Sequence, residues 1–299
     1  MVAPICLFVY NRFNNVVSLL DSLKGNYLSN ESDLFVFSDG PKSSSDIESI
    51  DLIRKYLSNI NGFKSVFVIE RKNNLGLAKS IISGVSEVIS KYGSAIVLED
   101  DLILSNNFLV FMNQALVNYN SNKLVCSISG YRPNFQINES FPFDAFFSHR
   151  VTSWGWATWK DRWNKVDWDF KNVYIKDEVN VKLYGDDLKS LISKQLNEDI
   201  DSWAIRWFYF HLLNNLYAIV PKISKVRNVG FGDCATHTKL QSSFFDSILD
   251  LSENTFFLFP SAFDIDNKVL SRKHINHYSY MNKIYHRCIS MISRVIKYK

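Results

Sequence analysis

Three acidic residues in succession, Glu99, Asp100 and Asp101, directly follow a short apolar run at residues 95–98. That run has the length and composition of a buried β-strand, so the carboxylates are expected at a strand end. Carboxylates that lie so close together repel one another, and a cation or the protonation of one of them relieves the repulsion. Mg²⁺ and Mn²⁺ prefer such oxygen ligands and often bridge to substrate phosphates. The alternative is a solvated turn that leads into a helix N-terminus, where acidic residues are electrostatically favoured.

Polar side chains also follow the three earlier apolar runs of the chain. Asn11 and Arg12 follow the first run, Asp39 the second and Arg71 the third. The carboxyl ends of parallel strands share one edge of a sheet, and ligands bind in the crevice beyond that edge. Carboxylates and guanidinium groups together suit a ligand that is anionic and also coordinates a cation. For any one of these residues alone, the alternative is that it is an ordinary polar residue of a loop.

The elements that must position these residues alternate between strands and helices. Apolar runs lie at residues 5–10, 34–37, 66–69 and 95–98. Helical spacing of apolar residues separates the runs, and Ser45 with Glu48 has the pattern of a capping box at the start of the second helix. Strand and helix alternation with continuously apolar strands predicts an α/β fold, with a mostly parallel sheet covered by helices on both faces.

Beyond residue 124 the alternation stops. Further strands are predicted at residues 124–128 and 217–221, and a helix within residues 191–216. All seven tryptophans lie between Trp154 and Trp207. No internal repeat and no domain boundary is apparent before about residue 240.

Composition and missing motifs exclude several classes of protein. The 299 residues contain no stretch of roughly 20 uninterrupted apolar residues, which a membrane-spanning helix requires. Neither a Walker loop nor a G-x-G-x-x-G turn is present, which excludes the P-loop and dinucleotide-binding fingerprints. The apolar N-terminal run lacks a preceding basic region and is interpreted as a strand, not a signal peptide. Four scattered cysteines without a C-x-x-C pair favour reducing cytosol.

The charge is divided unevenly along the chain. All 30 acidic residues lie at or before Asp266, whereas eight of the 34 basic residues lie in the last 33 positions, so the body carries −4 and the C-terminal segment +8. The body is therefore not expected to bind nucleic acid. Within residues 275–299 an apolar stripe at helical spacing is flanked by basic residues, which predicts an amphipathic helix on an anionic membrane surface. Packing against the body, or pairing with another subunit, is the alternative.

Taken in order, these motifs resemble a GT-A nucleotide-sugar glycosyltransferase over roughly residues 4–240. The Glu-Asp-Asp strand end is similar to the Asp-x-Asp motif in the form that the N-acetylglucosaminyltransferase I family has. Later blocks resemble bacterial glycosyltransferases of surface-polysaccharide synthesis. The segments that carry the resemblance are Tyr10-Asn11-Arg12, Ser38-Asp39-Gly40, residues 71–78, Glu99-Asp100-Asp101, residues 154–156 and 201–207, Asn228-Val229-Gly230-Phe231 and His237.

The resemblance implies roles for individual residues. Asp39 would hold uracil or another base in a pocket lined by Tyr10, Asn11 and Arg12. Glu99 and Asp100 would lie at the nucleotide sugar, with Asp100 on the ribose. Asp101 would bind Mn²⁺ or Mg²⁺ at the diphosphate, and His237 would close over the metal from the C-terminal side. Arg71 and Lys79 are candidates for contacts with the base or the diphosphate.

The chemistry of glycosyl transfer suggests two further groups. An inverting enzyme needs a carboxylate that takes the proton of the acceptor hydroxyl, and Asp201 is the choice, with Glu198 and Asp199 as neighbours that could substitute. Without the resemblance, a helix N-cap or a surface charge is the slightly favoured interpretation of Asp201. Indole rings stack on the apolar faces of sugars, so at least one of three tryptophans is expected to contact the donor or acceptor sugar, although a core position is the alternative. The three are Trp154, Trp156 and Trp203.

The expected protein is thus a metal-dependent, inverting glycosyltransferase with a UDP-sugar as the favoured donor and a glycan or lipid-linked glycan as acceptor. It would be cytoplasmic and peripheral on the inner face of the membrane. Residues 1–240 would form the GT-A domain, with a nucleotide-binding half up to about residue 125 and an acceptor half from 126; residues 241–274 would connect it to the tail. The alternatives are a retaining glycosyltransferase on the same fold, a sugar nucleotidyltransferase and a non-catalytic, membrane-tethered binding module.

Overall fold

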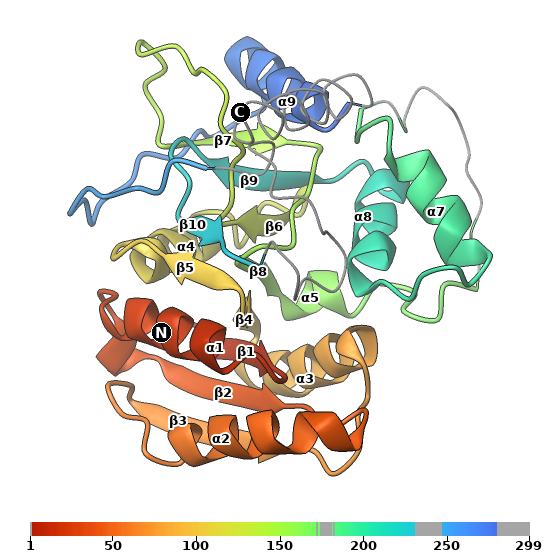
Figure 1. Cartoon of the computed structure of the whole chain (residues 1–299). Helices are drawn as coiled ribbons and strands as arrows, with labels where there is room; N and C mark the ends of the chain where they lie inside the picture. The colour runs from red at the N-terminus through yellow and green to blue at the C-terminus, as the bar shows by residue number, and fades with distance from the viewer. Residues whose placement is uncertain (1, 172, 174–180, 182, 231–246, 280–299) are drawn as a thin grey trace, which may run out of the picture.

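The structure is a computed structural model that describes residues 2–171, 173, 181, 183–230 and 247–279 (Figure 1). Ten strands belong to it: β1 (Ile5–Val9), β2 (Asp33–Ser38), β3 (Ser65–Glu70), β4 (Ser94–Glu99), β5 (Leu102–Leu104), β6 (Val125–Ser129), β7 (Ala145–Ser148), β8 (Trp156–Trp159), β9 (Tyr217–Pro221) and β10 (Val226–Asn228). The α-helices among the described residues are α1 (Phe13–Lys24), α2 (Ile47–Leu57), α3 (Leu77–Tyr92), α4 (Phe108–Asn118), α5 (Lys160–Trp163), α7 (Leu188–Leu196), α8 (Trp203–Leu213) and α9 (Ile265–His277).

Eight strands form one central sheet in the order β3-β2-β1-β4-β8-β6-β9-β7. The strands β3, β2, β1 and β4 are parallel to one another, and β6 is parallel to β9. Strand β8 pairs antiparallel with both β4 and β6, and β7 pairs antiparallel with β9. The prediction of an α/β fold with a mostly parallel sheet is confirmed. Both antiparallel strands of this sheet lie beyond residue 124, where the sequence pattern no longer alternates.

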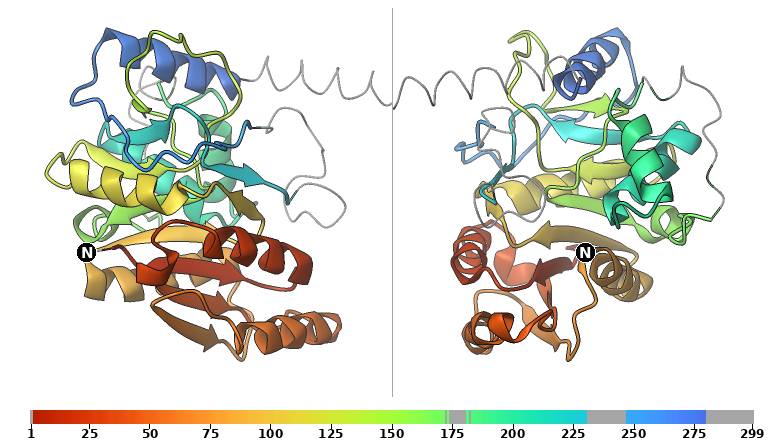
Figure 2. Two further views of the ribbon diagram at one scale, coloured as in Figure 1. Left: turned by 90° about the vertical axis from the view of Figure 1, so that its left-hand side faces the viewer. Right: turned by 45° about the vertical axis from the view of Figure 1, so that its right-hand side comes forward.

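Helices cover the sheet on both faces, as the right-hand view of Figure 2 shows for α1 and α2 on one side and α3 on the other. The period of two along β1 explains this arrangement. Ile5, Leu7 and Val9 join the core beneath α1, α2 and α4, whereas Cys6 and Phe8 join the core beneath α3 and α8. The buried strands are apolar throughout because each of their faces meets a helix layer.

Tryptophans fill the core between the second half of the sheet and α8. The ring of Trp156 on β8 stacks on that of Trp203 on α8 at 4.9 Å and on that of Trp163 at 5.6 Å between centroids. Trp168 and Trp207 complete the cluster. Stacked aromatic pairs contribute roughly 0.5–1.5 kcal/mol beyond their buried area. The cluster therefore fixes the N-terminus of α8 close to the start of β8.

The segment after residue 247 packs on the same body. Phe257 and Leu270 belong to its two large cores, and α9 lies against β7. Helix α9 also crosses residue 275, where the tail was expected to begin. Most of that tail and His237 lie outside the described residues. Within the described part of the chain, no helix combines the length and the apolar character that crossing a membrane requires.

Candidate active site

The parallel strands bring the predicted polar residues to one edge of the sheet. Val9 at the end of β1 pairs with Ser38 at the end of β2, and Ser38 pairs with Glu70 at the end of β3. On the other side of β1, Phe8 pairs with Glu99. The connections that follow these strands therefore start from neighbouring points of the sheet edge. They carry Asn11, Arg12, Asp39, Arg71 and the acidic triplet.

Arg12 lies against the acidic triplet. Its guanidinium forms an ion pair with the Asp100 carboxylate, and its Nη1 lies 3.4 Å from Oδ2 of Asp101. The backbone N–H of Tyr10 donates to the other oxygen of Asp100 at 3.4 Å. The structure places Arg12, which was expected to line a base pocket, beside the carboxylates as their counter-ion.

Arg12 offsets only part of the negative charge. Burial raises the pKa of Asp100 to about 6, although the neighbouring Arg12 opposes the shift. Burial also raises the pKa of Glu99, and the charges of Asp101 and Asp100 add to the effect. The pKa of Arg12, which burial alone would lower, is raised by the carboxylates of Asp100 and Asp101. Arg12 therefore does not remove all of the unfavourable charge at the strand end, and the predicted cation site stays a prediction.

Asp101 has the features of a ligand for that cation. Its Oδ1 is buried and has no hydrogen-bond partner among the described residues, whereas Oδ2 faces Arg12. A buried carboxylate oxygen without a partner is costly, and a metal ion would relieve that cost. Among the described residues, no group of three His, Cys, Asp or Glu side chains is arranged to hold a metal. Mg²⁺ and Mn²⁺ do not require such a group, since one or two carboxylates with substrate phosphates and water suffice.

The end of β10 holds Asp101 in place. The N–H of Val229 donates to the backbone oxygen of Asp101 at 2.8 Å, and Asn228 accepts a hydrogen bond from the N–H of Gly230 at 2.8 Å. Gly230 lies so close to the Asp101 side chain that a Cβ on it would be 2.4 Å from Oδ2. The Asn228-Val229-Gly230 segment was noted in the sequence only for its resemblance. Its contact with Asp101 could not be read from the residues.

The Asp39 carboxylate accepts hydrogen bonds from backbone N–H groups of the protein instead of facing open space. It is buried, and its Oδ1 accepts hydrogen bonds from the N–H groups of Gly40 and Leu75, both at 3.0 Å. Its Oδ2 accepts from the N–H of Gly76 at 3.1 Å. These bonds fix the turn that precedes α3, so Asp39 shapes the predicted base pocket through the loop it holds.

Tyr10 and Asn11 are tied to the loop before α2. The Tyr10 hydroxyl accepts a hydrogen bond from the N–H of Lys42 at 2.9 Å, and the Asn11 amide donates to Asp46 at 2.8 Å. Asp46 also forms the capping box with Ser43, two residues before the predicted pair Ser45 and Glu48. The prediction was wrong by two positions because a short 3-10 turn at Ser44–Asp46 precedes the helix. Asp46 was missed for the same reason.

Arg71 and Lys79 lie around the start of α3. The Arg71 guanidinium bonds to Ser80 and, at 3.2 Å, to the hydroxyl of Ser83. Lys79 is exposed. Arg54 of α2, which the sequence analysis missed, donates to the backbone oxygen of Arg71 at 2.8 Å and to Ser38 at 3.2 Å. Because the Arg54 guanidinium reaches the ends of two strands from a neighbouring helix, the sequence around it does not indicate these contacts.

Asp201 and the tryptophans lie toward the second half of the sheet. Because Trp203 stacks on Trp156, which pairs with Val97 near the end of β4, the N-terminus of α8 lies near the same sheet edge. Asp201, two residues earlier, is 71% exposed and pairs with Arg206 at 2.8 Å. Trp156 and Trp203 are buried in the tryptophan core, whereas Trp154 is partly exposed and packs edge-on against Tyr131. Of the three, only Trp154 keeps an exposed part for a sugar.

No family model matches the chain, and no curated protein matches it. Among solved structures it is similar to S. aureus TarS residues 1–349, with 11% identity and a TM-score of 0.44 over 77% of this chain and 61% of that one. It spans 25% of a longer S. aureus TarS chain. A mannosyltransferase, PcManGT from Pyrobaculum calidifontis in complex with GDP-Man and Mn²⁺, has 10% identity and a TM-score of 0.42 over 71% of this chain and 69% of that one. The galactosyltransferase LgtC, in complex with donor and acceptor sugar analogues, has 9% identity and a TM-score of 0.36 over 70% of each chain. At these values, function has to be inferred from the chain's own residues.

Gly230→Ala tests the contact at Asp101. The added methyl group would displace the Asp101 carboxylate, so we expect weaker Mn²⁺ binding, by roughly 10-fold or more as for other groups that orient metal ligands. Isothermal titration calorimetry with Mn²⁺ measures the change.

Gly25→Ala is the matched control, because a Cβ there would be no closer than 3.6 Å to any neighbour. Equal Mn²⁺ affinity in the Gly230 variant and the wild type would show that Gly230 does not set the position of Asp101.

Proposed function

We propose that the protein is a metal-dependent, inverting glycosyltransferase. It transfers a sugar from a nucleoside diphosphate donor, with UDP favoured, to a glycan or lipid-linked glycan acceptor. The single observation that carries the proposal is the buried Oδ1 of Asp101 at the end of a parallel strand, which has no partner within the described part of the chain. That oxygen lies in a strand-end cluster of carboxylates that Arg12 only partly offsets.

The proposed roles divide the acidic triplet. Asp101, with His237 from outside the described residues, would hold Mn²⁺ or Mg²⁺, and the bound ion would offset the charge of the departing diphosphate. Asp100, fixed by Arg12 and the Tyr10 N–H, would contact the ribose. Tyr10 and Asn11 would border the base, on the loop that Asp46 holds. Arg71 and Lys79 would border the base or diphosphate from the start of α3.

Asp101→Asn tests the metal site. The amide keeps the size of the side chain but removes its charge, so we expect the Mn²⁺ affinity and Mn²⁺-dependent donor turnover to fall by at least roughly 100-fold. The measurements are calorimetry with Mn²⁺ and nucleotide release from a panel of nucleoside diphosphate sugars.

Asp51→Asn, an exposed residue of α2, is the control. Unchanged turnover in the Asp101 variant contradicts the proposal. Nucleotide binding without release by the wild type would indicate a binding module, and release of pyrophosphate from sugar phosphate and nucleoside triphosphate would indicate a sugar nucleotidyltransferase.

For the inverting mechanism we assign to Asp201 the role of the base that takes the proton of the acceptor hydroxyl. Its exposed carboxylate is accessible to an acceptor, and Arg206 orients it by an ion pair at 2.8 Å. Trp154, the partly exposed tryptophan near this edge, would stack on a sugar. The buried Trp156 and Trp203 would support α8 beneath the acceptor.

Asp201→Asn separates the inverting from the retaining mechanism. Asn can still accept a hydrogen bond from Arg206 but cannot take a proton, so transfer to an acceptor should fall by roughly 100- to 10,000-fold while donor binding remains. Product formation at saturating donor measures the effect. If Asp201→Asn keeps most of the activity, the result favours a retaining enzyme. If the activity is lost in Asp199→Asn instead, Asp199 is the base.

The basic C-terminal segment suggests that the acceptor is reached at an anionic membrane surface of the cytoplasm. Eight basic residues and no acidic ones occupy the last 33 positions. Deletion of residues 280–299 should therefore abolish co-sedimentation with vesicles of phosphatidylglycerol, while donor hydrolysis is spared. Neutral phosphatidylcholine vesicles are the control, and undiminished sedimentation of the shortened chain with anionic vesicles would exclude this role.

A further inference from the structure

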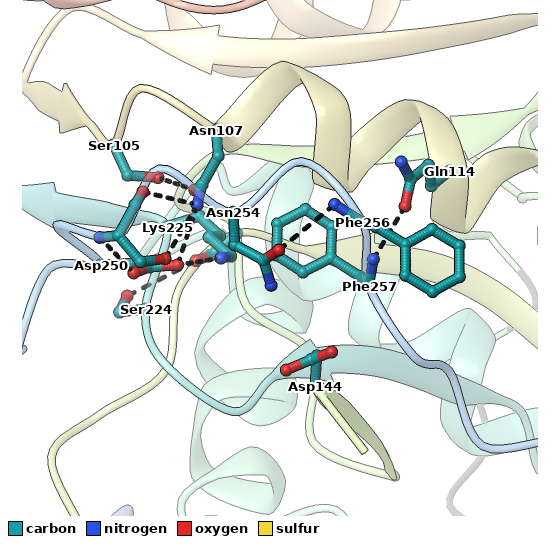
Figure 3. A network of polar contacts seen from close by, with 12 residues as sticks. Ser105, Asn107, Gln114, Asp144, Ser224, Lys225, Asp250, Asn254, Phe256 and Phe257 are labelled. Atoms are coloured by element: carbon teal, nitrogen blue, oxygen red, sulfur yellow. Dashed lines mark hydrogen bonds and ion pairs between the residues drawn. The ribbon is translucent and has the colours of Figure 1, made fainter.

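A second charged cluster lies outside the strand-end site, between β10 and the segment after residue 247 (Figure 3). Lys225 and Asp250 form an ion pair whose side chains are only 3% and 5% exposed. The Lys225 ammonium also lies 4.2 Å from the ring centre of Phe257 and 5.4 Å from that of Phe111. Asp250 accepts further hydrogen bonds from the Asn107 amide at 3.1 Å and from the N–H of Ser252 at 2.9 Å. The pair is thus fully enclosed, with aromatic rings around the cation.

The pair lies at one end of the small two-stranded sheet. Lys225 immediately precedes β10, and its backbone oxygen accepts a hydrogen bond from the N–H of Ser105, next to the end of β5, at 2.9 Å. The segment that carries Asp250 joins at the same point, because the N–H of Asp250 donates to Ser224 at 2.8 Å and Ser247 donates to Val226 at 3.1 Å. Charged and backbone contacts therefore fix this end of the sheet from both sides.

Asp101 lies at the other end of the same small sheet. Val226 pairs with Leu104 and Asn228 pairs with Leu102, directly after Asp101. Three-residue strands in a two-stranded sheet hold their register poorly by themselves. A shift of β10 by one residue would remove Gly230 from the Asp101 side chain. The register of β10 therefore determines the position of the carboxylate.

We propose that the Lys225–Asp250 ion pair positions Asp101 for metal binding by fixing the register of β10 on β5. The inference rests on the proposed function, since it assigns the ion pair to the metal ligand of that site. Buried ion pairs add little net stability compared with apolar side chains, but their geometry is demanding. Here the geometry links a segment more than 20 residues further along the chain to the strand that leads to Gly230.

The test compares two buried ion pairs of the same molecule. Asp250→Asn removes the charge that holds Lys225. Asp187→Asn breaks the buried pair with Arg150, whose Nη1 lies 2.7 Å from the Asp187 carboxylate. Arg150 follows β7, which runs opposite to the parallel strands, so that pair lies away from the strand-end site. We measure the affinity for Mn²⁺ alone by calorimetry, unfolding in urea, and hydrogen exchange of the peptides that contain Ser105 and Val229.

We expect Asp250→Asn to weaken Mn²⁺ binding roughly 10-fold or more and to speed exchange at Ser105 and Val229. Asp187→Asn should lower stability without either effect, and Asp250→Glu should recover most of the Mn²⁺ affinity. If Asp250→Asn does not fold, Lys225→Arg, which keeps the charge but alters the geometry, should show the same two effects in weaker form.

Wild-type Mn²⁺ affinity in a folded Asp250→Asn or Lys225→Arg variant overturns the positioning role, and so does an equal loss in Asp187→Asn. Absence of Mn²⁺ binding by the wild type would instead overturn the proposed metal site itself, and the role of the ion pair with it.

Discussion

Repulsion between adjacent carboxylates at the end of β4 is the constraint on which the rest of the site depends. Glu99, Asp100 and Asp101 follow a strand that is buried on both faces, where the charged forms are poorly solvated. Arg12 is the only positive side chain recorded in contact with the triplet among the described residues, and it lies at the end of the neighbouring strand. The parallel pairing of β1 with β4 thus brings Arg12 next to the triplet, where its charge reduces the repulsion between the carboxylates.

Most polar residues around this edge bind the protein's own backbone. Asp39 holds the turn before α3, and Arg54 joins the ends of β2 and β3. Asp46 holds the loop before α2, which contacts the Tyr10 hydroxyl. Loops without regular structure must satisfy their backbone N–H groups in this way. Because such bonds fix the loops at the strand ends, these loops would need little reorganisation to bind a ligand.

The sequence predicted the first half of the fold better than the second. Apolar runs and helical spacing were sufficient for β1 to β4 and for α1 to α3, because buried parallel strands and amphipathic helices leave local patterns. Strand β8 was not predicted, since its Trp156–Trp159 sequence is equally compatible with a core helix or loop. The grouping of Arg12, Asp39 and the acidic triplet followed from the shared edge of parallel strands. The contacts of Gly230 and Asp250 with distant residues could not be predicted, because they depend on the packing of segments more than 100 residues from Asp101.

The position of β8 in the sheet limits how the molecule can change shape. This strand is hydrogen-bonded to β4, in the half of the sheet that contains β1 to β4, and to β6, in the half that also contains β9 and β7, so one continuous sheet spans both. Rotation of the halves about a hinge would break those backbone bonds and expose the stacked indoles beneath them. Any change of shape is therefore confined to the connecting loops, over a platform that stays rigid.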